Sequence, residues 1–149
     1  MIRHSLLLLG VVLLANSSFS QMSLKSKGSD GWGYSDKYEQ NFTKFGIKTY
    51  YGEIKSVDTV TPLPDMSFGI QLTVTIDNAD QIVHLGPAWF LLRQDNMNFA
   101  KGENVEVLGP KVTIKGKQVI MASEIKKKDR KLFLRDKDGV PCWSAWRKE

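Results

Sequence analysis

His84 is the first candidate for chemistry in this 149-residue sequence, because an imidazole can bind an anion, hold a metal or fix a backbone corner through a hydrogen bond. It lies two residues before Gly86-Pro87, at the end of an apolar segment. A zinc site normally needs four ligands, but no other histidine or cysteine stands at ligand spacing from His84, and Cys142 is the only cysteine. We therefore expect His84 to contact a ligand or to hold a corner, with a metal or haem carrier centred on it as an alternative.

The second candidate is a run of basic residues, Lys126-Lys127-Lys128-Asp129-Arg130-Lys131, which holds five positive charges and one negative charge. Lys126, Lys127, Lys128 and Arg130 could follow the phosphates of a polymer. Such a run also suits the solvated tip of a hairpin, where lysines discourage pairing with other sheet edges. Both interpretations place the run on the surface.

Two tryptophans near the end of the sequence, Trp143 and Trp146, could stack on a base or a sugar, or cover the open end of a small barrel. A single-stranded nucleic acid requires aromatic and basic residues on one exposed face. Tyr50, Tyr51 and Lys48 supply part of such a face. These residues keep single-stranded DNA open as an alternative ligand.

Motifs for enzyme chemistry are absent from the sequence. There is no nucleophile elbow and no glycine-rich phosphate or dinucleotide loop. We therefore predict no catalytic residues, no resident cofactor and no metal site. The formal charge of +5, from 21 basic and 16 acidic residues, is modest and favours an anionic partner only weakly.

The N-terminal segment, residues 1–20, has the layout of a secretory signal peptide. Arg3 precedes the apolar run of residues 6–15, and small residues at Ser18 and Ser20 provide a cleavage site after Ser20. The apolar run is shorter than the roughly 20 residues that span a bilayer, and no later segment is long enough. We therefore expect a periplasmic or secreted protein whose mature charge is about +4, because cleavage removes Arg3.

The elements that position these candidates are mainly strands. A polar arm or linker over residues 21–46 precedes a domain over residues 47–149 that includes a C-terminal extension. Alternating apolar residues and turn signals predict strands at 48–60, 70–76, 81–86, 104–108, 112–114, 118–125 and 132–134, with one helix at 88–94. Three strands, a short helix and further strands are typical of an OB-fold. We therefore predict an all-β fold: a five-stranded OB-like barrel with one short helix between its third and fourth strands, plus a C-terminal strand. An SH3-like barrel and a small β-sandwich are the alternatives.

Several motifs resemble those of a family of small exported bacterial proteins with an OB-like domain. They are Gly31-Trp32-Gly33-Tyr34, His84-Leu85-Gly86-Pro87-Ala88-Trp89, and Leu134-Arg135-Asp136 followed by Pro141-Cys142-Trp143-Ser144-Ala145-Trp146. More loosely, the sequence is similar to periplasmic bacterial OB-fold proteins linked to stress tolerance. The resemblance implies an OB-like fold and supplies no catalytic residue. A likeness of fold alone is a weak argument for function.

Together these observations favour an exported, non-catalytic OB-fold binding or accessory protein. Its partner would be an anionic small or polymeric ligand, or an envelope protein, contacted near His84 and the basic run. The alternatives are a nucleic-acid-binding protein and a metal or haem carrier. The sequence leaves the oligomeric state open.

Overall fold

The computed structural model describes residues 29–95 and 97–147. The predicted signal peptide and residues 21–28 of the predicted arm lie outside the described residues. The elements in chain order are η1 (Glu39–Asn41), β1 (Lys48–Val60), β2 (Gly69–Ile76), β3 (Ala79–Pro87), α2 (Ala88–Leu91), β4 (Asn104–Gly109), β5 (Lys111–Ile114), β6 (Lys117–Met121), β7 (Glu124–Lys127), β8 (Arg130–Phe133) and η2 (Cys142–Arg147).

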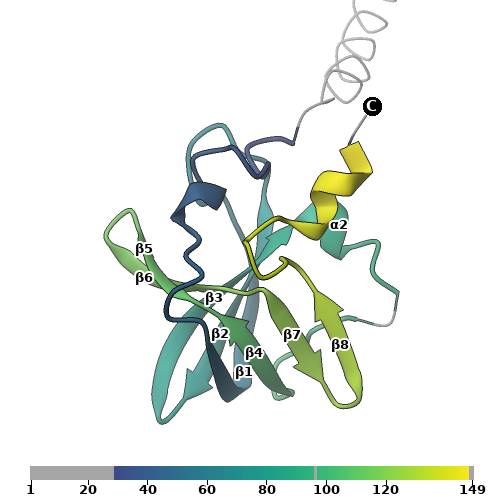
Figure 1. Cartoon of the computed structure of the whole chain (residues 1–149). Coiled ribbons are helices and arrows are strands. Elements are labelled where there is room, and N and C mark those ends of the chain that lie inside the picture. The colour runs from purple at the N-terminus through teal and green to yellow at the C-terminus, as the bar shows by residue number, and fades with distance from the viewer. Residues whose placement is uncertain (1–28, 96, 148–149) are drawn as a thin grey trace, which may run out of the picture.

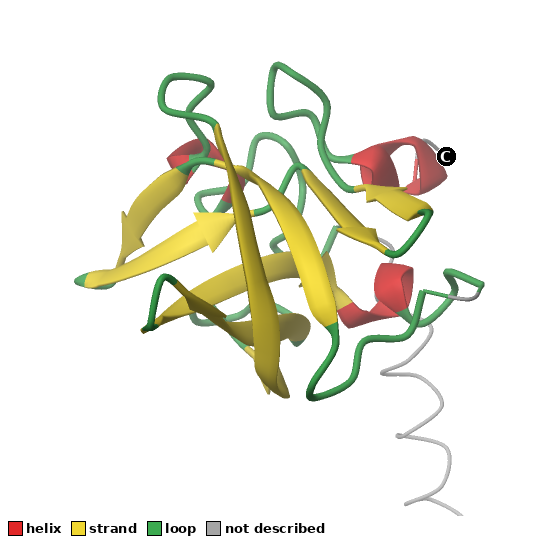
Figure 2. Ribbon diagram, turned by 90° about the horizontal axis from the view of Figure 1, so that it is seen from below, coloured by secondary structure: helices red, strands yellow, loops and turns green. Residues whose placement is uncertain are grey.

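The described residues form one open sheet of eight strands in the order β5-β6-β3-β2-β1-β4-β7-β8 (Figure 1). All neighbouring strands are antiparallel except β3 and β6, which pair in parallel at Val83 with Ile120 and at His84 with Met121. The all-β prediction is therefore confirmed, and α2 is the short helix expected between the third and fourth strands. Figure 2 shows how strongly the sheet twists and how the helices lie at its margins.

The predicted five-stranded barrel is wrong in its strand count and in its closure, because the structure has eight strands in an open sheet. Gly109-Pro110 divides β4 from β5, since proline has no N–H to donate to a ladder. The strand predicted over residues 118–125 is divided into β6 and β7 at Ala122 and Ser123. Their N–H groups donate to the carbonyls of His84 and Leu108 instead of continuing one ladder. The hairpin of β7 and β8 then adds two strands beyond β4.

Local sequence explains the meander of β1, β2 and β3. Leu72 and Val74 in β2 are fully buried, and the polar residues that alternate with them, Gln71, Thr73 and Thr75, are half-buried, which is the period of two expected for a strand. Asp77 and Asn78 both have positive φ, of 51° and 66°, and therefore form a tight two-residue hairpin turn into β3. Pro87 then ends β3 in an extended conformation and precedes the first residue of α2.

β1 changes partners along its length. It pairs with β4 as far as Glu53 and with β2 from Glu53 onwards. Gly52 lies at this change, and a Cβ atom at that position would overlap the carbonyl oxygen of Thr75. Glycine therefore permits the close approach of β1 to β2.

Segments outside the sheet complete the core. Trp32 and Tyr38, from the predicted arm, and Trp143, from η2, are each no more than 1 % exposed. The indole N–H of Trp143 donates to the carbonyl of Trp32 at 2.8 Å, and the Trp143 ring packs 5.4 Å from that of Phe90 in α2. Both ends of the described chain are therefore held against the same part of the sheet. In the described part of the chain, no helix is long and apolar enough to cross a membrane.

Candidate functional site

The basic run lies on the hairpin of β7 and β8. Ile125 and Leu132 face the core, so the side chains that alternate with them point outwards. Lys128, with φ of 55°, and Asp129 form the two-residue turn. Lys126 and Lys131 therefore point outwards and Lys128 stands at the tip, whereas Lys127 and Arg130 lie opposite each other on the same side as Ile125 and Leu132, next to the turn.

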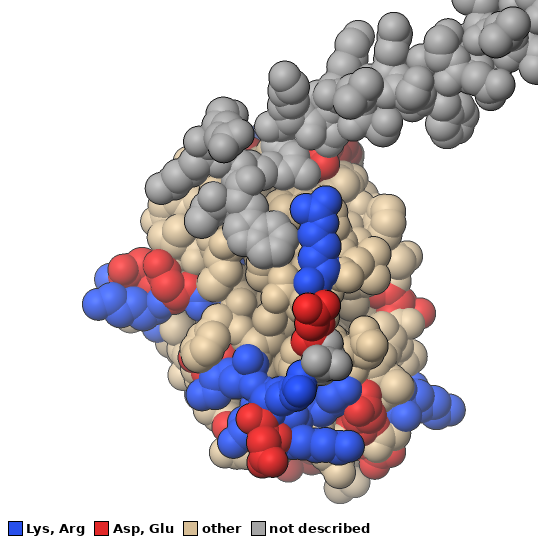
Figure 3. Space-filling model, turned by 90° about the vertical axis from the view of Figure 1, so that its right-hand side faces the viewer, with Lys and Arg blue, Asp and Glu red and all other residues tan. Residues whose placement is uncertain are grey.

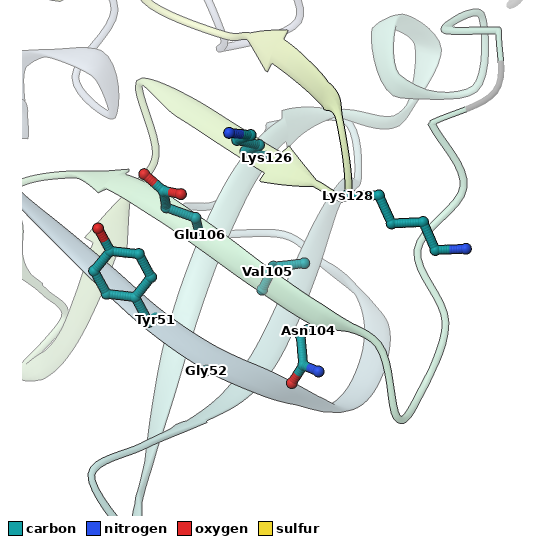
Figure 4. A pocket seen from close by; sticks show the side chains of 7 residues that line it. All are labelled: Tyr51, Gly52, Asn104, Val105, Glu106, Lys126 and Lys128. Carbon is teal, nitrogen blue, oxygen red and sulfur yellow. The ribbon is translucent and has the colours of Figure 1, made fainter.

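Cross-strand pairing extends this outer surface over four strands. Tyr51 of β1 lies opposite Glu106 of β4, Glu106 lies opposite Lys126 of β7, and Lys126 lies opposite Lys131 of β8. Tyr51, Glu106 and Lys126 also line a shallow depression of about 360 Å³ (Figure 4). We call this surface, with Asn104 and the turn residue Lys128 at its edge, the hairpin face.

The cations of the basic run differ in their partners. The Lys127 ammonium lies 3.0 Å from a Glu103 carboxylate oxygen and also donates to the carbonyl of Asn98, and Lys131 lies 3.5 Å from Glu124. Hydrogen bonding by Lys127 lowers the pKa of the Glu103 carboxyl.

Lys126, Lys128 and Arg130 are exposed, and they form no salt bridge within the described residues. Figure 3 shows the basic side chains gathered on one part of the surface with acidic side chains among them. These three cations are therefore the ones available to an external anion.

His84 belongs to a different part of the molecule. It is 3 % exposed and lines a cleft of about 260 Å³ that shares no residue with the depression of the hairpin face. Its Nδ1 atom lies 3.0 Å from the hydroxyl of Tyr38. The sequence grouped His84 with the basic run, and the structure places them in separate hollows.

Behind His84 lies a buried ion pair between Arg135 and Glu39. Arg135 Nε and Nη2 each lie 2.9 Å from a different carboxylate oxygen of Glu39, and both side chains are fully enclosed. Arg135 Nη1 also donates to the carbonyl of Ala122 at 2.5 Å, and the guanidinium stacks 5.1 Å from the Trp143 ring. A bidentate pair of this kind fixes the orientation of both groups.

Burial controls the protonation of this cluster. Burial raises the pKa of Tyr38 far above its ordinary value and raises the pKa of Glu39, although the Arg135 charge opposes both shifts. Burial lowers the pKa of Arg135, but its interactions with Glu39 and Tyr38 raise this pKa by more, so the net shift is upward. Burial and the Arg135 charge together lower the pKa of His84 to about 4. At neutral pH the cluster therefore contains a cationic Arg135, a protonated Tyr38 and a neutral His84.

The remaining predicted site residues lie in η2. Trp143 is buried and its indole N–H is used within the fold. The side chain of Trp146 lies outside the described part of the structure. Cys142 is half-buried, and burial raises the pKa of its thiol. Within the described residues, no three His, Cys, Asp or Glu side chains come together as metal ligands.

Sequence reasoning missed Glu39, Tyr38 and Arg135. Glu39 and Arg135 are 96 positions apart, so no local spacing signals their pairing. Arg135 was noticed only within the motif Leu134-Arg135-Asp136. Its neighbours Leu134, fully buried, and Trp143 are the only signal that the guanidinium points inwards.

Removing one partner of the buried pair should destabilise the protein strongly. We expect Glu39→Leu to lower the free energy of unfolding by about 3–5 kcal/mol, because Arg135 is left buried without its counter-ion. Arg135→Met should lower the free energy of unfolding by a similar amount. In a double-mutant cycle of urea unfolding at pH 7, the double variant should lose clearly less free energy of unfolding than the sum of the two single losses. Additive single losses would contradict the coupling.

Acid should weaken the fold through His84. The unfolded histidine has a pKa of about 6.5 and the folded one about 4, so the unfolded chain binds the proton first as the pH falls. The free energy of unfolding should therefore decrease between pH 6.5 and pH 4, by about 3 kcal/mol in total from this residue. His84→Asn keeps an acceptor near Tyr38 and does not titrate, so its unfolding free energy should fall less over this range. Equal pH profiles from urea unfolding would contradict the assignment.

Comparison with known proteins gives one positive result. The profile of the MamS/MamX magnetosome protein family matches residues 46–132, which is more than half of the 149 residues. The match covers β1 to β7 and most of β8. No curated protein and no solved structure matches the chain.

Proposed function

The chain belongs to the MamS/MamX magnetosome protein family, and from this premise we propose that it is an exported, non-catalytic accessory protein of magnetosomes that binds an anionic polymer through its hairpin face. The ligand class is a chain of repeated phosphate groups. The supporting observation is that Lys126 and Lys128 stand exposed, without a salt bridge in the described structure, beside a depression that carries the exposed ring of Tyr51. Arg130, which is also exposed, follows the turn of the same hairpin.

The connectivity of the sheet supports an OB-like interpretation of the core. β1, β2 and β3 form an antiparallel meander, β6 returns parallel to β3, and β4 lies on the other side of β1. β5 follows β4 after Pro110 alone. OB-folds bind polymers on exposed strands and loops, which suits the hairpin face. The resemblance to small exported OB-fold proteins, including periplasmic stress proteins, is consistent with the same proposal.

Physical chemistry favours a phosphate polymer over a base-stacking ligand. Cations that neutralise phosphates release condensed counter-ions, so binding does not require a deep pocket. Non-specific single-strand binding uses successive aromatic platforms. Among the four directly opposed residues of the hairpin face, only Tyr51 is aromatic, and Glu106 lies between it and Lys126. We therefore expect the polymer backbone, and not its bases, to be recognised.

The charge of the hairpin face can be tested with two probes, fluorescent inorganic polyphosphate and a labelled oligothymidylate. Both should bind, and the logarithm of the affinity should fall with the logarithm of salt concentration with a slope of about −2, as expected for three phosphate contacts on a single strand. The double variant K126E/K128E should weaken binding by about tenfold or more and flatten the slope. Fluorescence anisotropy at several salt concentrations measures both quantities.

The matched control is K115E/K117E, which makes the same charge change at the turn between β5 and β6. It should leave polyphosphate binding nearly unchanged apart from a small general effect of net charge. Equal losses in the two double variants would show that only net charge matters, and would overturn the hairpin face as the site. Binding of oligothymidylate without polyphosphate binding would favour the nucleic-acid alternative instead.

Export is the second part of the proposal, and it rests on residues 1–20. Removal of this segment after Ser20 would give a mature chain that begins at Gln21. The intact mass of protein recovered from the periplasm or the medium should correspond to residues 21–149. A mass that retains Met1 to Ser20 would contradict a cleaved signal peptide.

A further inference from the structure

The cleft beside His84 combines an apolar wall with a polar floor and rim. Ile82, Ile114 and Val119 supply apolar side chains, and Ile114 and Val119 are each less than 10 % exposed. His84 lies among them, and Lys115 and Lys117 stand at the tip of the hairpin of β5 and β6 (Figure 1). The cleft therefore offers apolar side chains, an imidazole and two ammonium groups to one occupant.

The buried cluster determines which nitrogen of His84 carries its proton. Arg135 is held by Glu39, and its positive charge acts on the Tyr38 hydroxyl. A cation beside a hydroxyl favours the arrangement in which the oxygen faces the charge and the proton points away from it. The Nδ1 atom of His84 lies 3.0 Å from this hydroxyl, and we take it as the acceptor of the Tyr38 proton. The neutral His84 ring therefore carries its hydrogen on Nε2.

The Nε2–H group of His84 is available to a ligand. Within the described ranges 29–95 and 97–147, Nε2 makes no hydrogen bond, and His84 contributes to the lining of the cleft. A donor that lines a cavity is satisfied when an occupant accepts from it. The charge of Arg135, acting through Tyr38, thus favours one donor on His84 for the cleft.

The rim adds positive charge at a fixed place. Lys115 and Gly116 have positive φ, of 49° and 76°, which is the geometry of a tight two-residue hairpin turn. In the part of the chain that the structure describes, neither Lys115 nor Lys117 forms a salt bridge. Both ammonium groups can therefore attract an anion towards the Nε2–H donor of His84.

We propose that this cleft is a binding site for a small monocarboxylate with an apolar tail. The carboxylate accepts the hydrogen bond from His84 Nε2 and lies near Lys115 and Lys117, while the tail packs on Ile82, Ile114 and Val119. One neutral donor and two solvated cations suit a single negative charge. The volume of about 260 Å³ corresponds to roughly nine water molecules, which is enough for an acid of about ten heavy atoms such as octanoate. This site is independent of the hairpin face.

The test is a calorimetric titration of the purified protein with octanoate, and with octan-1-ol as the neutral ligand of matched length. Octanoate should bind at one site, and octan-1-ol about tenfold more weakly or worse, because it lacks the charge. The variant K115E/K117E should bind octanoate at least about tenfold more weakly than the original protein, whereas K126E/K128E should bind octanoate normally. The two double variants therefore exchange roles relative to the polyphosphate experiment, so the failure of one proposal is distinguishable from the failure of the other.

Two substitutions of His84 separate its two nitrogens. His84→Gln can place an amide N–H near the position of Nε2, and His84→Asn can replace only the group at Nδ1. Among variants whose thermal unfolding shows a folded protein, His84→Gln should bind octanoate within about threefold of the original protein, and His84→Asn should lose about tenfold. Equal affinities in these two variants would overturn the proposal, as would equal binding of octan-1-ol or no saturable binding of octanoate at millimolar concentration.

A measurement without substitutions covers the case in which neither variant folds. Long-range ¹H–¹⁵N NMR correlations report which ring nitrogen of a histidine is protonated. At pH 7 the His84 ring should show a protonated Nε2 and an unprotonated Nδ1, and the Nε2 signal should shift when octanoate is added. A proton on Nδ1, or an Nε2 signal that octanoate does not move, would overturn the site.

Discussion

The ion pair between Glu39 and Arg135 is the contact on which the arrangement of the other elements depends. It joins the N-terminal segment that precedes β1 to the segment that follows β8, and Arg135 also bonds the backbone between β6 and β7. Removing two charges from water is costly, and a buried pair is seldom more stabilising than apolar residues of the same volume. The pair mainly fixes geometry, because the two N–H donors of the guanidinium fit only one placement of the carboxylate. The Trp143 ring packs 5.1 Å from the same guanidinium, and its indole N–H donates to the carbonyl of Trp32.

The same contact connects the core to the cleft at His84. Without Glu39, Arg135 would be free to rotate, and its charge would no longer be fixed beside the Tyr38 hydroxyl. Tyr38 could then accept from Nδ1–H of His84 as readily as donate to Nδ1, so the tautomer of His84 would no longer be determined. Under the proposal for the cleft, the ion pair would therefore also influence the binding of the acid. Perturbed pKa values at His84 and Tyr38 record the same burial and do not by themselves indicate catalysis.

Sequence patterns were informative where structure is local. Alternation over residues 70–76 predicted β2, and Gly86-Pro87 predicted the position of α2, because each signal lies within one element. The run of charge at residues 126–131 predicted a solvated hairpin for the same reason. The pairing of Glu39 with Arg135 could not be predicted, because a charged residue normally indicates a solvated position and the partners are 96 positions apart. The strand predicted over residues 118–125 is two strands, because backbone groups change partners at Ala122 and Ser123 without any change in the apolar pattern.

The two candidate surfaces differ in how strongly water screens them. Charges on the hairpin face act through solvent, so their effect on a partner decreases as salt shortens the Debye length. The proposed His84 donor lines a cleft whose walls are partly apolar, where a hydrogen bond to an anion is screened less than on the open surface. Salt should therefore weaken a ligand at the hairpin face far more than one held at Nε2 of His84. The two proposed sites share no lining residue, so a polymer at one and a small acid at the other would interfere little with each other.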